Sequence, residues 1–398
     1  MENKTLSKPT HKSFIFLVTI LSVTVIVGCS TFIPTPTPTV IVLNIGTEVP
    51  TKTPVPSATF TSIPEPSLTP TALPAISLTT EIISSQNINQ LQQLDIRELI
   101  SKPEDFLLRD MDFTSEGRNV ISISDSKIYI WSGLTGQLIG SMDHSMYLWS
   151  VAISSDGSMA ASGADQGSIK LWNLKTGKEI YTLIHDNNVW NTIWSLAFSP
   201  DNTILVSGDM DANVTGWDIQ TGKELFNLVN PNGVSSDSLA FSPDGKILAI
   251  GTDYRIDLWD TNSKKLIRTL IFDLRGGEGF SGIQGVLFSP DGKEIAAADG
   301  DNIAMVWEVS SGKKMDVIVG KGTFIRESKG ALAFTADGKM LAVGNDNGSI
   351  IFWDVFTNKE LRTIGSEKCI PLDLNFGFDG KLLEIGCYNG TIQLWGIP

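Results

Sequence analysis

The sequence from about residue 88 to its last residue repeats one pattern seven times. In each unit an apolar run ends in Phe, or once in Ile, and a turn of the Ser-Pro-Asp-Gly-Lys type follows. A Trp stands 18 or 19 residues after that anchor. Seven anchors at nearly constant spacing indicate one repeat array rather than two or three separate domains. The anchor pairs are Phe113 and Trp131, Ile153 and Trp172, Phe198 and Trp217, Phe241 and Trp259, Phe288 and Trp307, Phe334 and Trp353, and Phe376 and Trp395.

Each unit predicts four short β-strands. Stretches with period-two alternation, such as residues 168–172 and 204–207, are separated by turns rich in Gly, Asp and Asn. A second turn follows each of the first six Trp anchors, and a further stretch such as residues 179–183 comes after it. The sequence therefore predicts an all-β fold built from repeated four-stranded units.

These units resemble the WD-repeat family, in which repeats of about 40 to 45 residues each form one blade of a β-propeller. The Trp-Asp dipeptide that names the family is intact at Trp217, Trp259 and Trp353. The resemblance implies a seven-bladed propeller of four-stranded antiparallel blades over residues 86–398, with the seven Trp anchors in its core. The family's Gly-His dipeptide is absent from every unit, so its network of His, Ser, Asp and Trp is not expected.

The two ends of the repeat region predict how the ring closes. The last unit stops after its third strand, whereas residues 87–99 precede the first unit and contain several apolar residues. We predict that this N-terminal segment supplies the fourth strand of the terminal blade. Such an exchange closes the ring and removes an open sheet edge.

Residues 1–28 predict an export signal. Three lysines precede a charge-free apolar run at residues 14–27, which has the length of a signal peptide's hydrophobic region. The run leads to Cys29 in a pattern that resembles the bacterial lipobox, which implies a lipid on Cys29 and an anchor on the extracytoplasmic side of a bacterial membrane. An uncleaved anchor is the alternative, because apolar residues continue to Ile33.

Residues 29–85 predict a spacer between this anchor and the propeller. Ten prolines alternate with Thr and Ser between residues 34 and 74. Proline fixes the backbone and removes hydrogen-bond donors, so such a stretch is typical of an extended, polyproline-like segment. At about 3.1 Å per residue it would reach at most about 170 Å.

The candidate binding residues lie where the repeat varies in length. Only the distance from each Trp to the next anchor changes, from 22 to 29 residues. The family resemblance places this connection on the top face beside the central channel, and loops that vary on a constant scaffold often carry binding residues. Packing of Trp149 and Trp194 between blades is the alternative for those two residues. We predict that a protein, peptide or glycan binds through Tyr147, Trp149, Trp190, Trp194, Arg275, Phe280, Phe324 and Arg326.

The sequence shows no catalytic or metal-binding motif. His144 and His185 lack the spacing of metal ligands, and there is no nucleophile elbow or phosphate-binding Gly-rich loop. Asp209, Asp211 and Asn213 imitate the start of a calcium loop, but a turn explains Asp, Asn or Gly at this place in every repeat. We predict a monomeric binding module with no cofactor and no metal; a propeller hydrolase or lyase at the central channel is the alternative.

Charge and cysteines bear on partners and compartment. The formal charge of −14 argues against nucleic acid as a partner, since binding its backbone depends on Lys and Arg. Apart from Cys29, the cysteines are Cys369 and Cys387, both in the last unit. Hairpin register places them on neighbouring strands near the limit of reach, so a disulfide can form there outside the cytoplasm.

Overall fold

The computed structural model describes most of the repeat region. The export signal, Cys29 and residues 29–80 of the predicted spacer lie outside the described residues and stay predictions. Within the described part of the chain, no helix has the length and apolar character needed to cross a membrane. The described residues are 81–99, 108–114, 117–133, 135–185, 191–229, 235, 238–252, 254–272, 282–299, 303–319, 331–365, 369–377 and 379–398.

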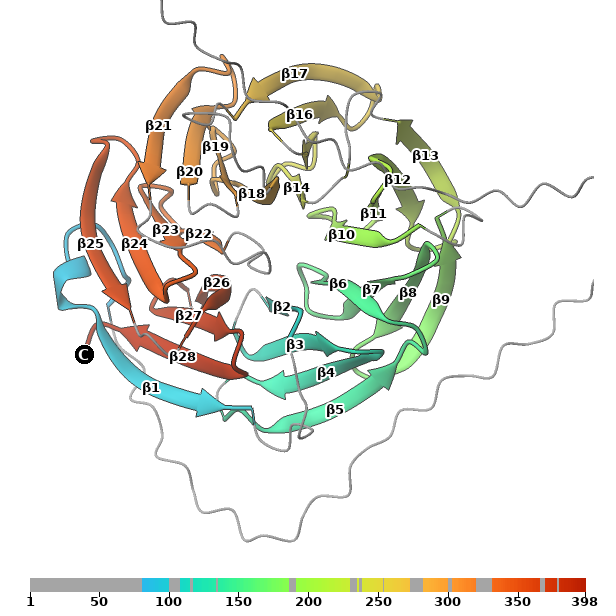
Figure 1. The fold of residues 1–398 in the computed structure, drawn as a ribbon, viewed down its shortest axis with the longest axis horizontal. Helices are drawn as coiled ribbons and strands as arrows, with labels where there is room; N and C mark the ends of the chain where they lie inside the picture. Colours follow the sequence, from blue (N-terminus) through green and yellow to red (C-terminus); the bar gives the residue numbers. More distant parts are fainter. Residues whose placement is uncertain are drawn as a thin grey trace, which may run out of the picture. The chain divides into compact units, whose positions relative to one another are not determined.

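Seven four-stranded antiparallel sheets, which we call blades, stand around a common centre (Figure 1). The first strand of each repeat unit lies innermost and the fourth lies at the circumference. This confirms the predicted seven-bladed all-β propeller. Because neighbouring strands are antiparallel, the connections between blades share one face with the turns from second to third strand. We call this the top face, and the other turns lie on the bottom face.

The strands of the first four blades follow the chain in order. Blade 1 contains β2 (Asp110–Phe113), β3 (Asn119–Ser124), β4 (Lys127–Ser132) and β5 (Leu138–Asp143). Blade 2 contains β6 (Leu148–Ile153), β7 (Met159–Ala164), β8 (Ser168–Asn173) and β9 (Lys178–Ile184). Blade 3 contains β10 (Ile193–Phe198), β11 (Ile204–Asp209), β12 (Asn213–Asp218) and β13 (Glu224–Val229). Blade 4 contains β14 (Ser238–Phe241), β15 (Ile247–Gly251), β16 (Arg255–Asp260) and β17 (Lys265–Ile271).

The last three blades include the one that joins the two ends of the repeat region. Blade 5 contains β18 (Ile283–Phe288), β19 (Glu294–Asp299), β20 (Ile303–Glu308) and β21 (Lys314–Val319). Blade 6 contains β22 (Leu332–Phe334), β23 (Met340–Gly344), β24 (Ser349–Asp354) and β25 (Lys359–Gly365). Blade 7 contains β26 (Pro371–Gly377), β27 (Leu382–Cys387), β28 (Thr391–Gly396) and β1 (Gln92–Glu98).

The place of a strand in its blade decides its burial. The second strands β7 and β19 are buried at nearly every position and are rich in Ala, whereas the outer strand β13 is mostly exposed. A second strand has a neighbouring blade on each of its faces, and small side chains let the sheets approach closely. The core is therefore a series of apolar layers between blades rather than a single centre.

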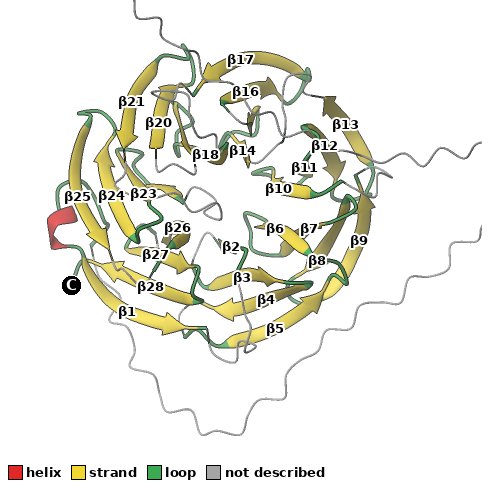
Figure 2. Ribbon diagram, viewed as in Figure 1, coloured by secondary structure: helices red, strands yellow, loops and turns green. Residues whose placement is uncertain are grey.

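β1 closes the ring as predicted. It runs antiparallel to β28, with Gln93 opposite Trp395 (Figure 1). A short 3₁₀ helix, η1 (Ile88–Gln90), precedes β1 at the rim of blade 6 (Figure 2). Its Ile88 is buried, and Nη1 of Arg362 on β25 donates a hydrogen bond of 2.7 Å to the Ile88 carbonyl oxygen. The N-terminal segment thus contacts blade 6 as well as completing blade 7.

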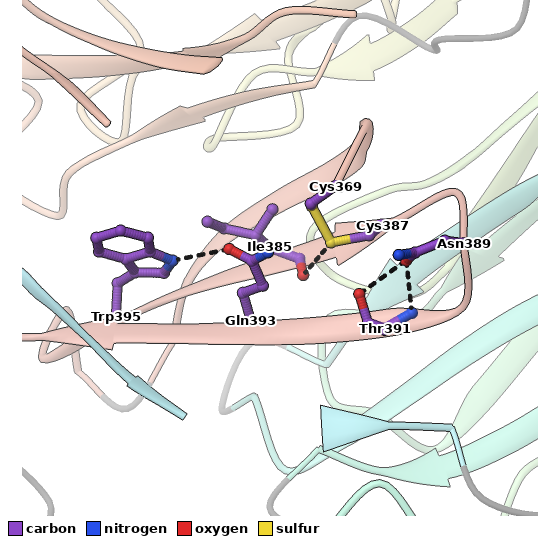
Figure 3. The surroundings of a disulfide bond; sticks show 7 residues. All are labelled: Cys369, Ile385, Cys387, Asn389, Thr391, Gln393 and Trp395. Atoms are coloured by element: carbon purple, nitrogen blue, oxygen red, sulfur yellow. Dashed lines mark hydrogen bonds between the residues drawn. A yellow bond between two sulfur atoms is a disulfide. The ribbon is translucent and has the colours of Figure 1, made fainter. Parts of the chain in front are cut away.

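A disulfide joins Cys369 to Cys387 in the closing blade (Figure 3). Cys369 precedes β26 and Cys387 is the last residue of β27, and their Cα atoms are 5.0 Å apart. Both side chains are buried in the apolar layer between blades 6 and 7. The bond therefore connects the first and second strands of blade 7 at their top-face ends.

The Trp anchors differ in burial. Trp259 and Trp353 are only half-buried, although each packs against a core layer. The indole N–H groups of these two have no hydrogen-bond partner among the described residues. The predicted core role therefore holds in full for the five buried anchors, Trp131, Trp172, Trp217, Trp307 and Trp395.

The expectation that the His, Ser, Asp and Trp network is missing is wrong in part, because blade 2 links His, Ser and Trp without Asp. In blade 2 Ser162 Oγ accepts a 2.9 Å hydrogen bond from Trp172 Nε1 and lies 2.7 Å from Nδ1 of His144. Burial and the nearby Lys170 ammonium lower the pKa of His144 to about 3, so this ring is neutral. A histidine without its preceding glycine still reaches this position.

Blade 3 holds the same residue types in two separate contacts. Trp217 Nε1 donates a 2.9 Å hydrogen bond to Ser207 Oγ, and His185 Nδ1 lies 3.1 Å from Oδ2 of Asp209. All four of these residues are buried. The second contact holds His185, which follows β9 of blade 2, against the end of β11 in blade 3.

A buried acid lies between the closing blade and blade 1. Glu384 on β27 is fully buried, and Nδ2 of Asn375 donates a 2.8 Å hydrogen bond to its Oε2. Gly117 lies against this carboxyl group, because a Cβ atom there would come within 2.5 Å of Glu384 Oε1. Burial raises the pKa of Glu384 to about 8, so the group is protonated in the folded chain at neutral pH.

This burial predicts a loss of stability as the pH rises from 4.5 to about 8. The folded-state pKa of Glu384 lies above the unfolded value of 4.5, so folding takes up a proton between pH 4.5 and about 8. Its contribution to the free energy of unfolding is complete below pH 4.5 and is lost as the pH rises toward 8. We expect Glu384→Gln, which mimics the protonated group, to unfold at a higher temperature than the wild type near pH 8, with a smaller difference near pH 4.5. Thermal unfolding across this range tests it, and a difference that does not change with pH would contradict it.

Candidate binding site at the central channel

A cavity of about 270 Å³ lies among the innermost strands. Every blade contributes the residue that stands three positions before its Phe or Ile anchor, which we call the channel position. This position is a small residue in five blades and Asp in the two blades that meet at the ring closure. The seven residues are Asp110, Ser150, Ser195, Ser238, Gly285, Ala331 and Asp373.

Side chains at the channel position can tie one blade to the next. The N–H of Val151 in blade 2 donates a 2.8 Å hydrogen bond to Oδ2 of Asp110 in blade 1. The N–H of Val286 in blade 5 makes the same bond, 2.9 Å long, to Oγ of Ser238 in blade 4. The innermost strands have no strand partner on their channel side, so these bonds satisfy backbone donors that would otherwise face the cavity.

The closing blades make one side of the cavity acidic. Asp112, two residues after Asp110, also lines it, and its Oδ2 accepts a 2.8 Å hydrogen bond from the N–H of Ile153. Burial raises the pKa of Asp373 well above its ordinary value, and the carboxylates of Asp112 and Asp110 raise it further. The free cavity therefore disfavours a third negative charge.

An aromatic stack stands beside the cavity. We use this name for Arg109, Tyr147, Trp149 and Trp194, which come from blades 1, 2 and 3. The ring centroids of Trp149 and Trp194 are 4.8 Å apart, and those of Tyr147 and Trp149 are 5.3 Å apart. The Arg109 guanidinium carbon lies 4.4 Å from the Tyr147 centroid and 5.0 Å from the Trp149 centroid. All four side chains are half-buried, and Trp194 also lines the cavity.

Asp165 holds the stack in place from the top face. Trp149 Nε1 donates a 2.6 Å hydrogen bond to Oδ1 of Asp165, and the N–H of Asp165 donates to the Tyr147 carbonyl oxygen at 3.1 Å. Thr192, in the connection to blade 3, donates a 3.3 Å hydrogen bond to the same Oδ1. Asp165 thus fixes the Trp149 indole and the backbone at Tyr147.

The structure brings together three of the eight predicted binding residues. Trp149 contacts both Tyr147 and Trp194. The sequence had left two roles open for Trp149 and Trp194, binding a partner and packing between blades. The placement in top-face loops is wrong for two of the three, because Trp149 lies in β6 and Trp194 in β10, where they pack between blades 2 and 3. All three keep part of their surface exposed. The other five lie outside the described residues: Trp190, Arg275, Phe280, Phe324 and Arg326.

Sequence reasoning missed Arg109 and the channel position. Arg109 precedes the first unit's strand and was not linked to the aromatic residues, which belong to a later unit. The channel position could have been found in the sequence, because it lies at a constant distance from each Phe or Ile anchor. It is occupied by a small residue in every unit except those with Asp110 and Asp373. Aligning the seven units on their anchors would have shown this.

The sequence that imitates a calcium loop forms a turn. Oδ1 of Asp209 accepts hydrogen bonds from the N–H groups of Asp211 and Asn213, at 3.0 and 2.8 Å. Its Oδ2 accepts from the side chains of Asn191 and Asn213. Among the described residues, no three His, Cys, Asp or Glu side chains are placed to hold a metal ion.

Comparison with known proteins finds the same kind of repeat. The family model described as "WD domain, G-beta repeat" matches residues 136–173, 177–218, 226–260, 268–308 and 326–354. The chain is also similar to small ribosomal subunit protein RACK1 of Glycine max, with 26% identity over 178 residues. That stretch covers 42% of this chain and 40% of the soybean protein, so the chain spans less than half the length of this relative.

Proposed function

Because this chain belongs to the WD40-repeat propeller family, we propose that it is a scaffold that binds a partner protein over its top face. Propellers of this family typically serve as protein-binding scaffolds, and loops on a constant scaffold are common sites of recognition. The aromatic stack is the observation that supports this surface. We propose that the ring acts as a monomer and that its chemistry is recognition rather than catalysis.

The composition of the stack suits a protein interface. Tyr, Trp and Arg are the residue types most enriched at binding hot spots, because they bury a large area with little loss of side-chain freedom. Asp165 fixes Trp149, and Arg109 covers one side of the Tyr147 and Trp149 rings, so the surface is formed before a partner arrives. A preformed surface loses less entropy on binding than one that must be ordered.

No observation favours the alternative of a hydrolase or lyase at the channel. The described polar side chains around the cavity are carboxylates, hydroxyls and one amide. His144 is engaged with Ser162 and Ser168, and His185 with Asp209, all within the blades. Neither histidine is therefore placed at the channel as a general base, and the carboxylates there can recognise a positive charge.

We also propose that the ring is displayed outside the cytoplasmic membrane on a lipid attached to Cys29. The buried disulfide of Cys369 and Cys387 supports an oxidising compartment. We expect the full chain to fractionate with membranes and its Cys29→Ser variant to be released into the soluble fraction. Membrane association that persists in the variant would favour the uncleaved apolar anchor instead.

Photo-crosslinking of the full chain tests the proposed surface. A benzoylphenylalanine at Tyr147 should yield crosslinked partners of discrete mass from an envelope extract, because this side chain is part of the stack. The same group at Phe356 is the matched control, since this aromatic side chain is 61% exposed but lies in a bottom-face turn. Arg109→Ala should weaken crosslinking at Tyr147. Equal crosslinking at both positions, or crosslinking at Phe356 alone, would contradict a top-face interface.

A further inference from the structure

Within the described part of the chain, Asp373, at the channel position of blade 7, does not bond to the backbone of the next blade as Asp110 and Ser238 do. Asp110 and Ser238 each accept a hydrogen bond from the N–H of the following blade. Among the described residues, the one hydrogen bond to the Asp373 carboxylate comes from the N–H of its own neighbour Leu374, at 2.9 Å. Asp373 nevertheless lines the cavity, where it is half-buried. A group that enters the cavity can therefore reach its carboxylate.

The acidic groups near Asp373 come from β2 of blade 1 and from β27 of its own blade. Asp110 and Asp112 on β2 and Glu384 on β27 all raise its pKa, as does burial. Placing several carboxyl groups together in an enclosed space is unfavourable, because each charge repels the others and little water screens them. A cation entering the cavity would reverse this cost and let Asp373 ionise.

Apolar side chains also line part of the cavity wall. Leu196, Leu239 and Leu332 line it together with Trp194, which belongs to the aromatic stack. A bare metal ion makes no use of such a wall, and the acidic groups do not converge as metal ligands would. Lys and Arg side chains combine both requirements, since their methylene stems pack on apolar surface while the charged end seeks a carboxylate.

We propose that the channel receives a lysine or arginine side chain of the partner protein, with its charged end between Asp373 and Asp110 and its stem along Trp194. This rests on the proposed function, because the side chain would come from the protein that docks on the aromatic stack. The acidic channel then selects among partners: a segment that presents a basic side chain at this point gains a buried ion pair, and an acidic or apolar one does not.

Short peptides test the channel separately from the partner. The probes are blocked Gly-Gly-X-Gly-Gly peptides with X as Arg, Lys, norleucine or Glu, added to the full chain labelled at its Trp indoles. Arg and Lys peptides should shift the NMR signal of the Trp194 indole N–H in a saturable way, and norleucine and Glu peptides should not. Asp373→Asn should weaken the Arg peptide by about tenfold or more, the loss expected for one charge-assisted contact.

Two further variants separate lost charge from lost structure. Asp110→Ser keeps the bond to the N–H of Val151 in the way that Ser238 serves Val286, so it should fold normally and weaken the Arg peptide. Asp379→Asn removes a carboxylate from an exposed bottom-face turn of the same blade and should leave binding unchanged. The proposal would be overturned if the norleucine peptide binds as tightly as the Arg peptide. It would also be overturned if Asp373→Asn does not change the affinity for the Arg peptide.

A metal ion is the remaining alternative outcome. Calcium chloride that shifts the Trp194 signal where the Arg and Lys peptides do not would overturn the proposal in favour of an ion site. If the Arg and Lys peptides do not bind but crosslinking at Tyr147 is intact, the channel proposal is wrong and the proposed top-face scaffold is unaffected. Loss of crosslinking together with specific Arg binding would instead show that the channel works without the proposed interface.

Discussion

The pairing of β1 with β28 is the interaction on which the rest of the structure depends. Without β1, blade 7 would have three strands, and its outer edge would expose unpaired backbone groups of the kind that lead to aggregation. With it, the chain holds its first and last strands in one sheet, and the ring has no free end (Figure 1). The disulfide between Cys369 and Cys387 adds a covalent link inside this same blade.

Closure also creates the chemistry of the channel. Asp110 stands in the first repeat unit and Asp373 in the last, 263 positions apart in the sequence. The ring makes blades 1 and 7 neighbours, which brings the Asp110 carboxylate close enough to raise the pKa of Asp373. The acidic side of the cavity is therefore a product of the topology rather than of any local motif. The aromatic stack has a similar origin, because its members come from three blades.

The architecture could be predicted from the sequence because it depends on a periodic signal. The Phe and Trp anchors recur with almost no change in spacing, which indicated seven units. Alternating stretches and turns indicated four strands in each unit, and the short last unit indicated closure by the N-terminal segment. The site was harder, since its contacts cross between units. Tyr147, Trp149 and Trp194 were found by residue type and by their place in connections of variable length, while Arg109 was missed because nothing in its own unit marks it.

The error over the hydrogen-bond network has a physical explanation. The sequence test looked for a Gly-His dipeptide, but the network needs only a His side chain that reaches a buried Ser or Asp. His144 and His185 do so from connections with other residues before them. A dipeptide motif is one way to place a histidine side chain at this position, and other sequences can place it there as well.

An NMR titration of the Asp373 carboxyl carbon in the full chain tests the central claim, that closure places Asp373 in an enclosed, acidic channel. The pKa of Asp373 should lie well above its ordinary value of 3.8, and it should fall when Asp110 is replaced by Ser because one repelling charge is gone. An ordinary pKa for Asp373, or a raised pKa that stays the same in the Asp110→Ser variant, would show that closure does not place Asp373 in an acidic channel.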